Sequence, residues 1–226
     1  MRYPNIHRAV FADRPNRFVA HCEMGGEMLT VHVKNTGRCR ELLVPGTEVW
    51  LTKSGNPARK TAFDLIAVQK GPRLVNMDSA APNAAFGEYA RAGRFLPQTE
   101  NVRAEVRYGD SRFDFCLEAG GKTHFVEVKG VTLEENGAVR FPDAPTERGV
   151  KHLRELQKAA AEGHGTHAVF VIQMADVTRF FPNDDTHPAF GAALREAAAN
   201  GVRVHAFWCE VTPDSMEIAG EVPVVL

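Results

Sequence analysis

The sequence lacks several features that would place it in a specialised class of protein. No stretch approaches the roughly 18 consecutive apolar residues of a membrane-spanning helix, and residues 1–17 lack the apolar segment of a signal peptide. The cysteines include no C-x-x-C pair, which argues against a zinc site of the usual kind. We therefore expect a cytoplasmic protein that does not associate with membranes and whose thiols are unpaired.

A strong excess of charge is also absent. The net charge is −1 over 226 residues, with 44% hydrophobic and 24% charged residues, as in ordinary globular proteins of one or two domains. The charge is nevertheless uneven. Residues 1–85 contain 12 Lys and Arg against 7 Asp and Glu, whereas residues 86–226 contain 15 against 21. This division fits a nucleic-acid-binding module beside a metal-using catalytic module, and it fits a mixed surface without such meaning equally well.

The most informative stretch is Ser111–Gly130, which has the pattern of a β-hairpin. Residues 111–117 alternate, which predicts Phe113, Phe115 and Leu117 on one face and Asp114 on the other. Paired glycines follow in a turn, since glycine supplies the positive φ that hairpin turns need. Residues 123–130 form the expected return strand.

Three side chains of this hairpin have the chemistry of a phosphodiesterase site. Glu127 and Lys129 are two residues apart and therefore point the same way, beside Asp114 on the neighbouring strand. Carboxylates hold Mg²⁺, which polarises a phosphate and lowers the pKa of bound water, and a lysine orients that water or stabilises developing charge. The alternative is a cross-strand ion pair on a solvated face.

The N-terminal part predicts a small β-barrel, although the strand count alone also fits a sandwich. The expected strands cover residues 17–24, 27–33, 47–53, 61–71 and 73–78. Basic residues in the intervening polar segments are candidates for contacts to nucleic-acid phosphates, with salt bridges on a solvated loop as the alternative. They are Arg14, Arg17, Arg38, Arg40, Lys53, Arg59 and Lys60. The aromatic residues Phe18, Trp50 and Phe63 are expected in the core, with platforms on which bases stack as the alternative.

After a linker at residues 75–83, the C-terminal part predicts a mixed α/β sheet. Helices are expected at residues 84–93, 146–162 and 187–201, and strands at residues 101–109, 167–174 and 202–211 around the central hairpin. The tail, residues 217–226, has no assignable pattern. The chain is therefore divided into residues 1–83 and residues 84–226.

Several of these segments, in the same order, resemble the SfsA family of sugar fermentation stimulation proteins. They are RPNRFVA, HVKNTGRCRELLVPG, KSGNPARKTAFDLIAV, SRFDF, FVEVKGVTL and FPDAPTERGVKHLRELQ. The resemblance implies an N-terminal OB-fold, a C-terminal PD-(D/E)XK restriction-endonuclease-like domain, and DNA as the partner. The nuclease motif falls on Asp114 and on Glu127-Val128-Lys129, although Phe113 stands where the name of the motif has proline. Mg²⁺ or Mn²⁺ is the implied metal.

The same resemblance suggests further site residues on two helices. In folds of this class a helix before the core strands often presents an acidic ligand, which makes Glu88 a candidate third metal ligand. Its alternative role is an exposed carboxylate paired with Arg91. The helix after the catalytic strand often contributes a basic group, and Arg148 and Lys151 lie nearest its start.

Two functions follow from these observations. The first is a metal-dependent DNA nuclease that uses Asp114, Glu127 and Lys129. The second is a DNA-binding regulator of sugar metabolism whose nuclease fold no longer cuts. A protein-interaction module is a third class with little support. The sequence leaves open the oligomeric state, the choice between DNA and RNA, and the role in sugar metabolism.

Overall fold

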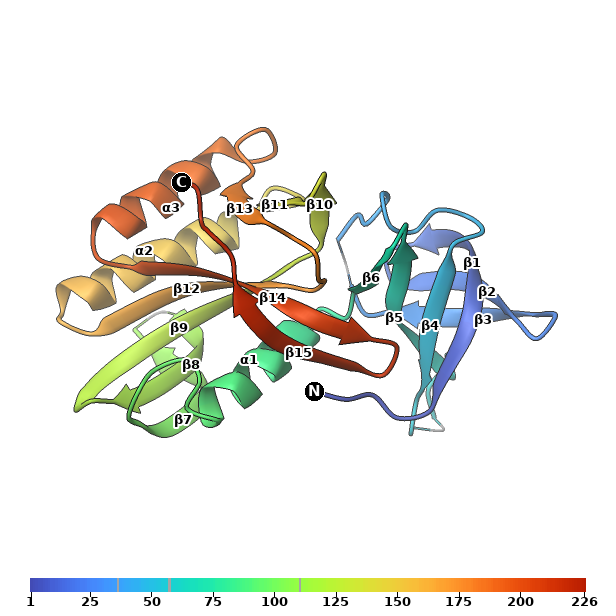
Figure 1. Cartoon of the computed structure of the whole chain (residues 1–226), viewed down its shortest axis with the longest axis horizontal. Coiled ribbons are helices and arrows are strands. Elements are labelled where there is room, and N and C mark those ends of the chain that lie inside the picture. Colours follow the sequence, from blue (N-terminus) through green and yellow to red (C-terminus); the bar gives the residue numbers. More distant parts are fainter. Residues whose placement is uncertain (36, 57, 110) are drawn as a thin grey trace.

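The structure, a computed structural model, describes residues 1–35, 37–56, 58–109 and 111–226. In this described chain six strands come first, and three helices with nine further strands follow. Figure 1 shows the two groups as bodies that lie side by side, a barrel of strands and a sheet with helices on both of its faces. No helix formed by the described residues is long and apolar enough to cross a membrane.

The first body is a small closed barrel. Its strands are β1 (Ile6–Asn16), β2 (Val19–Met24), β3 (Glu27–Val33), β4 (Glu48–Lys53), β5 (Phe63–Lys70) and β6 (Arg73–Asn76). They are hydrogen-bonded in the order β3-β2-β1-β4-β5-β6, and a parallel pairing of β3 with β5 closes the barrel. Two irregularities in the C-terminal half of β1 bend it, so that its first half pairs with β4 and its second half with β2. The predicted barrel is confirmed, and the sandwich alternative is wrong.

The second body is built on a six-stranded mixed sheet of order β15-β14-β12-β9-β8-β7. Its elements are α1 (Ala81–Arg91), β7 (Thr99–Tyr108), β8 (Ser111–Ala119), β9 (Lys122–Val131), β10 (Leu133–Glu135), β11 (Ala138–Phe141), α2 (Glu147–Ala161), β12 (Gly165–Ile172), β13 (Arg179–Pro182), α3 (Pro188–Ala199), β14 (Arg203–Thr212) and β15 (Ser215–Glu221). The three central strands β9, β12 and β14 are parallel, and the outer pairs are antiparallel. A small sheet of β10, β11 and β13 lies beside it. The mixed sheet is therefore confirmed.

The sheet separates two apolar layers. Helix α1 packs through Phe86 against one face, where Val126, Val128 and Val169 are buried. Helices α2 and α3 cover the other face, with side chains such as Leu156 in that core. Because α1 begins at Ala81, the expected division between residues 83 and 84 falls inside its first turn. The first residues of this helix therefore belong to the second body.

Buried ion pairs join the two bodies. The side chain of Glu134 in β10 is 3% exposed. Its carboxylate accepts from Lys70 Nζ at 2.7 Å and forms an ion pair with Arg73 Nη1 at 3.3 Å, both on the barrel side. Lys34 Nζ lies 2.5 Å from Oδ2 of the buried Asp78 at the join. Burial alone would raise the pKa of Glu134, but Lys70 and the other donors outweigh it and hold that pKa below its ordinary value. Separating the barrel from the sheet domain would leave the buried carboxylates without their cationic partners, which is energetically unfavourable. These ion pairs therefore hold the two bodies together.

A row of histidines crosses the sheet beneath the segment that follows α1. His124 Nδ1 lies 3.1 Å from His167 Nε2, and His167 Nδ1 lies 3.2 Å from His205 Nε2. The row ends at Glu221, whose Oε1 is 3.1 Å from His205 Nδ1. Burial, together with the neighbouring histidines His205 and His124, lowers the pKa of His167 to about 2. The ring therefore stays neutral in the native protein through mild acid.

This burial predicts a loss of stability in mild acid. The unfolded chain takes up a proton at His167 near pH 6.5 and the native chain does not, so the free energy of unfolding is fully present above about pH 6.5 and falls below it. The expected slope is up to about 1.4 kcal/mol per pH unit for this one group. Urea unfolding midpoints measured between pH 7.5 and pH 5.0 test it. His167→Gln should flatten the slope; an unchanged slope in that variant would contradict the assignment.

Candidate functional site

Strands β8 and β9 separate where the expected catalytic residues lie. Their antiparallel pairing runs from the hairpin turn to Phe115 opposite Val126 and goes no further. Beyond that pair, the Val128 N–H donates to Oδ2 of Asp114 at 2.8 Å, so a side-chain carboxylate replaces a main-chain carbonyl as its acceptor. We call the opening between β8 and β9 beyond the Phe115–Val126 pair the fork, and its residues are Asp114, Glu127 and Lys129. Asp114 lies at the point where the strands separate.

The alternation along β8 breaks at Asp114. Phe115 packs in the core beneath α1, whereas Phe113 packs with Phe125 in the core beneath α2, with ring centroids 5.3 Å apart. The expectation that Phe113 and Phe115 share a face is therefore wrong. Opposite Asp114 on β7, Glu105 has a φ of 58°, a left-handed conformation that is costly for a residue other than glycine. The sheet is locally distorted where the carboxylate is presented.

The Asp114 carboxylate has one further protein donor. Nδ2 of Asn83, in the first turn of α1, donates to its Oδ1 at 2.9 Å. Burial raises the pKa of Asp114, and the negative charge of Glu127 raises it further; the Val128 N–H, Lys129 and Asn83 offset only part of this. The two carboxylates therefore lie close enough to repel each other.

Glu127 is the most buried charged group of the cluster. Its side chain is 5% exposed, and Oε1 accepts from Lys129 Nζ at 2.5 Å and from His152 Nδ1. Its Oε2 is buried and has no hydrogen-bond partner among the described residues. Burial alone would raise the pKa of Glu127, but the His152 and Lys129 donors outweigh it and hold that pKa below its ordinary value. Glu127 is therefore an anion with one oxygen fixed and the other unpaired.

His152 belongs to this cluster, and the sequence did not predict it. Thr146 caps α2 by accepting from the Gly149 N–H at 3.1 Å, and this directs the next turn of the helix toward the sheet. His152 is 6% exposed, with Nδ1 on Glu127 and Nε2 3.4 Å from the Arg148 Nε. Because a carboxylate only accepts, His152 donates through Nδ1 and accepts from Arg148 through Nε2. The one available signal was its i+4 spacing from Arg148.

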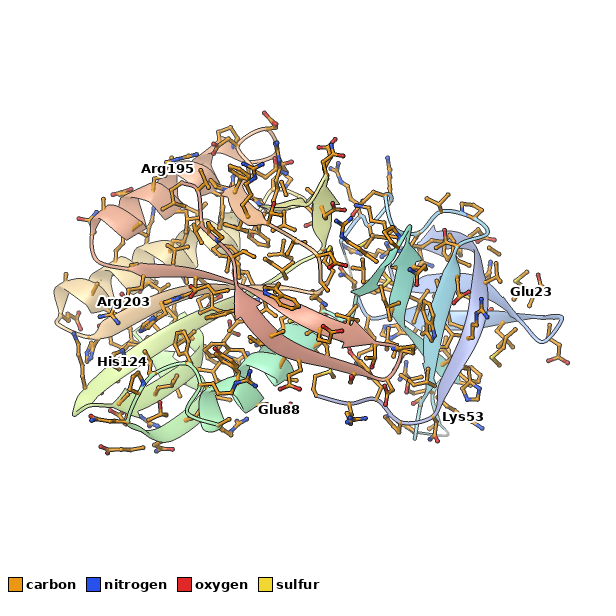
Figure 2. The ribbon with its side chains drawn as sticks, viewed as in Figure 1. Glu23, Lys53, Glu88, His124, Arg195 and Arg203 are labelled. Atoms are coloured by element: carbon orange, nitrogen blue, oxygen red, sulfur yellow. The ribbon has the colours of Figure 1, made fainter. Side chains whose placement is uncertain are left out.

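Two of the three predicted metal ligands meet, and the third does not. Oε2 of Glu88 accepts from the amino group of Met1 at 2.6 Å, and its side chain is 60% exposed. Figure 2 marks Glu88 on α1, five residues beyond Asn83 and so on a different side of the helix from the residue that bonds Asp114. The expectation that Glu88 joins Asp114 and Glu127 is corrected by this placement.

No complete metal-ligand set is formed by protein side chains alone. Within the described ranges, no three His, Cys, Asp or Glu side chains meet closely enough to hold a metal ion. Asp114 and Glu127 nevertheless offer the carboxylate oxygens that Mg²⁺ prefers, and Mg²⁺ usually keeps several waters rather than a full protein cage.

Two of the predicted DNA-binding arginines have structural roles instead. Both terminal guanidinium nitrogens of Arg14 donate to backbone carbonyls: Nη1 donates to Gly37 and Arg38 at 3.0 Å, and Nη2 to Arg17 and Asn35 at 2.7 Å. Arg14 thus ties the β1–β2 turn to the segment after β3. The structure therefore corrects its expected role.

Arg59 is likewise engaged within the barrel. Its guanidinium makes a two-pronged ion pair with Asp64, with nitrogen–oxygen distances of 2.6 and 3.0 Å. Burial opposes ionisation of Asp64, but Arg59 and His32 outweigh it and lower the pKa of that carboxyl. The expectation of a phosphate contact at Arg59 is therefore also corrected.

The other predicted contact residues are exposed but do not share one surface. Arg17, Arg38 and Arg40 line a hollow of about 330 Å³ at one end of the barrel. Lys53 and Lys60 lie toward the other end of β1, where Lys53 ends the strand that pairs with Ile6. Arg148 and Lys151 are exposed near the start of α2, beside the buried cluster.

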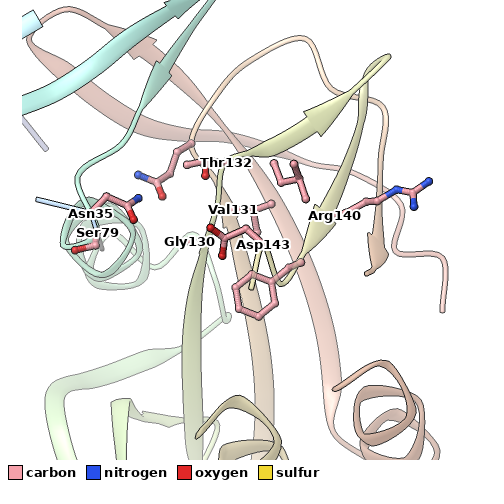
Figure 3. Close-up of a pocket in the computed structure, with 10 residues that line it drawn as sticks. Asn35, Ser79, Gly130, Val131, Thr132, Arg140 and Asp143 are labelled. Atoms are coloured by element: carbon pink, nitrogen blue, oxygen red, sulfur yellow. The ribbon is translucent and has the colours of Figure 1, made fainter. Parts of the chain in front are cut away.

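A cavity of about 120 Å³ lies where the barrel and the sheet domain meet (Figure 3). Asn35 and Ser79 line it from the barrel side, and Gly130, directly after Lys129, lines it from β9. Asp143, before α2, completes the polar wall. The cavity is therefore lined by residues of both domains, among them Gly130, the neighbour of Lys129 in the sequence.

The two kinds of arginine should respond differently to replacement. Arg14→Ala should lower the free energy of unfolding by about 2–4 kcal/mol, because four carbonyls lose a charged donor. Arg38 has an exposed side chain on the segment after β3 that Arg14 ties down. Arg38→Ala should change the free energy of unfolding by no more than about 0.5 kcal/mol. Guanidinium unfolding curves of the two variants test this, and equal losses would contradict the structural role of Arg14.

The chain was next compared with known proteins. A family model described as the SfsA N-terminal OB domain matches residues 13–77, and one described as the sugar fermentation stimulation protein RE domain matches residues 80–215. The barrel is thus an OB domain.

Full-length relatives agree with these matches. A sugar fermentation stimulation protein homolog of Desulfitobacterium hafniense strain Y51 is 54% identical over 226 residues, which cover all of this chain and 99% of that protein. The homolog of Clostridium beijerinckii is 50% identical over the full length of both. The structure of Pyrococcus furiosus SfsA in complex with Ca²⁺ superimposes with a TM-score of 0.90 at 27% identity, over all of this chain and 98% of that one. The chain therefore belongs to the SfsA family of sugar fermentation stimulation proteins.

Proposed function

We propose that this protein is a Mg²⁺- or Mn²⁺-dependent DNA phosphodiesterase of the PD-(D/E)XK type. The observation that carries the proposal is the unpaired, buried Oε2 of Glu127 next to the Asp114 carboxylate. Leaving an ionised oxygen buried without a partner is expensive, and the like charge of Asp114 makes it more so. A divalent cation between the two carboxylates relieves both costs.

The residues around the cluster fit a hard cation. His152 and Lys129 both donate to Oε1 of Glu127, which fixes the carboxylate and leaves Oε2 for the ion. Asp114 is held by Val128 and Asn83 through one hydrogen bond to each oxygen, which leaves lone pairs on both. Such outer partners orient the metal ligands. When bound, the ion would polarise the scissile phosphate and lower the pKa of a coordinated water.

The protein's own groups supply the remaining chemistry. Lys129 lies at the cluster through its contact with Glu127, where its ammonium can position the attacking water or stabilise charge developing on the phosphate. Arg148 is exposed in the first turn of α2, where a guanidinium and the helix N-terminus both favour a phosphate. Arg17, Arg38 and Arg40 of the OB domain hold the backbone of the DNA.

A relative provides further support for a hard divalent cation. Pyrococcus furiosus SfsA, whose fold this chain shares along its full length, has been solved in complex with Ca²⁺. Ca²⁺ and Mg²⁺ both prefer oxygen ligands, which Asp114 and Glu127 supply.

Metal binding should depend on the fork residues and not on Glu88. Asp114→Ala should weaken the binding of Mn²⁺ at least tenfold, because it removes a ligand and a charge. Glu88→Ala, a matched loss of one carboxylate elsewhere in the same domain, should leave the affinity unchanged. Isothermal titration of Mn²⁺ into both variants decides between them. Equal losses, or none, would rule out the fork as the site.

Cleavage should require Lys129 whereas binding should not. In Mg²⁺ or Mn²⁺, the protein should cut labelled single- or double-stranded DNA, and EDTA or Glu127→Ala should stop it. Lys129→Ala should lower the cleavage rate by about a hundredfold or more while changing DNA affinity by less than about threefold, since only one charge is lost. A Lys129→Ala protein that cuts at the parent rate refutes the role of this residue. If the parent binds DNA but never cuts it, the non-catalytic regulator is the correct function.

A further inference from the structure

Phe18 is exposed, whereas the other Phe, Tyr and Trp residues are buried or partly buried. Its side chain is 47% exposed, and it is the one exposed Phe, Tyr or Trp among the described residues, which include every aromatic of these three types. The expectation that Phe18 belongs to the core is therefore wrong. A single exposed apolar side chain is common on a protein surface, so the groups around the Phe18 ring decide whether it belongs to a binding surface.

The backbone around Phe18 is fixed although its ring is in solvent. The Phe18 N–H donates to Oδ1 of Asn16 at 2.9 Å, and the Phe18 carbonyl accepts from the Val33 N–H at 2.8 Å. The carbonyl of Arg17 accepts from Arg14 Nη2 at 2.7 Å. Hydrogen bonds thus hold the tight turn on both sides of the ring. A ring presented in this way loses little entropy when it binds a flat partner.

A cationic group lies against the Phe18 ring. The guanidinium carbon of Arg17 lies 5.0 Å from the centroid of the Phe18 ring. Arg17 also lines the basic hollow with Arg38 and Arg40. An aromatic platform beside a groove of arginines matches the alternation of flat bases and anionic phosphates along a nucleic-acid strand.

We propose that the OB domain binds single-stranded DNA, with one base stacked on Phe18 and the adjacent phosphates on Arg17, Arg38 and Arg40. This inference rests on the proposed function, because it names the form of DNA that the site receives. In a duplex both faces of each internal base are covered by neighbours, so Phe18 has no face on which to stack. A single strand presents its base faces, and each of them stacks on an aromatic ring whatever the sequence.

The structure also connects this platform to the carboxylate cluster. Gly37 lines the basic hollow, and a Cβ added to it would lie 2.7 Å from Oδ2 of Asp143. Asp143 in turn lines the cavity that continues to Gly130 and so to Lys129. The glycine allows the two domains to approach at this point, and a strand held at Phe18 extends toward the fork.

The experiment measures the fluorescence anisotropy of a labelled oligothymidylate and of a duplex of equal length. The full-length protein is used in EDTA and in the Glu127→Ala background, so that cleavage plays no part. The single strand should bind at least tenfold more tightly than the duplex. Phe18→Ala should weaken single-strand binding about tenfold or more, from the measured worth of one base–aromatic stack, and should leave duplex binding unchanged. Phe18→Trp should retain the affinity.

The matched control is Met28→Ala, which removes a side chain that is 60% exposed on the same barrel, away from the hollow. It should leave both affinities unchanged. Equal or tighter binding of the duplex overturns the inference, and the proposed nuclease would then act on double-stranded DNA. Equal effects of Phe18→Ala and Met28→Ala also overturn it. Failure to bind either form of DNA refutes the proposed function itself.

Discussion

The hydrogen bond from the Val128 N–H to Asp114 is the contact on which the rest of the site depends. It ends the pairing of β8 with β9, and the opening that results makes room for carboxylates within an otherwise continuous sheet. A main-chain acceptor at that position would have closed the ladder and left Asp114 on an ordinary strand face. The fork also brings Glu127 toward α2, where His152 fixes one of its oxygens.

Placing two carboxylates in this opening is electrostatically unfavourable, and their pKa values reflect it. Two carboxylates lie near each other in a largely buried place, so the pKa of Asp114 is raised whereas the donors on Glu127 keep the pKa of that group low. Environments that push neighbouring pKa values apart are typical of sites that do chemistry. The domain core is large enough to sustain this, because apolar layers cover both faces of the sheet.

The sequence predicted those parts that obey a simple period. The hairpin, the buried strand β12, the contact of Glu127 with Lys129 and the barrel all followed from alternation and turns. Strand β1 was missed because its bend and its charged residues interrupt the alternation, and β15 because its apolar positions are few. Glu88 and Arg14 were misassigned because their partners lie far away in the sequence or at backbone carbonyls, which no local pattern records. Arg59 was misassigned because it pairs with Asp64, five residues away, across a loop where neither the helix period nor the strand period relates the two side chains. Phe18 was misassigned because exposure depends on tertiary packing.

The buried ion pairs at Glu134 have a consequence for the geometry of the whole molecule. Because Lys70 and Arg73 of the barrel are fixed to a strand of the other domain, the separation between Phe18 and Lys129 is set by folded structure and not by a flexible linker. The base-stacking residue and the carboxylate cluster therefore lie a fixed distance apart. A strand with one base held at Phe18 would be cut at a constant number of nucleotides from that base.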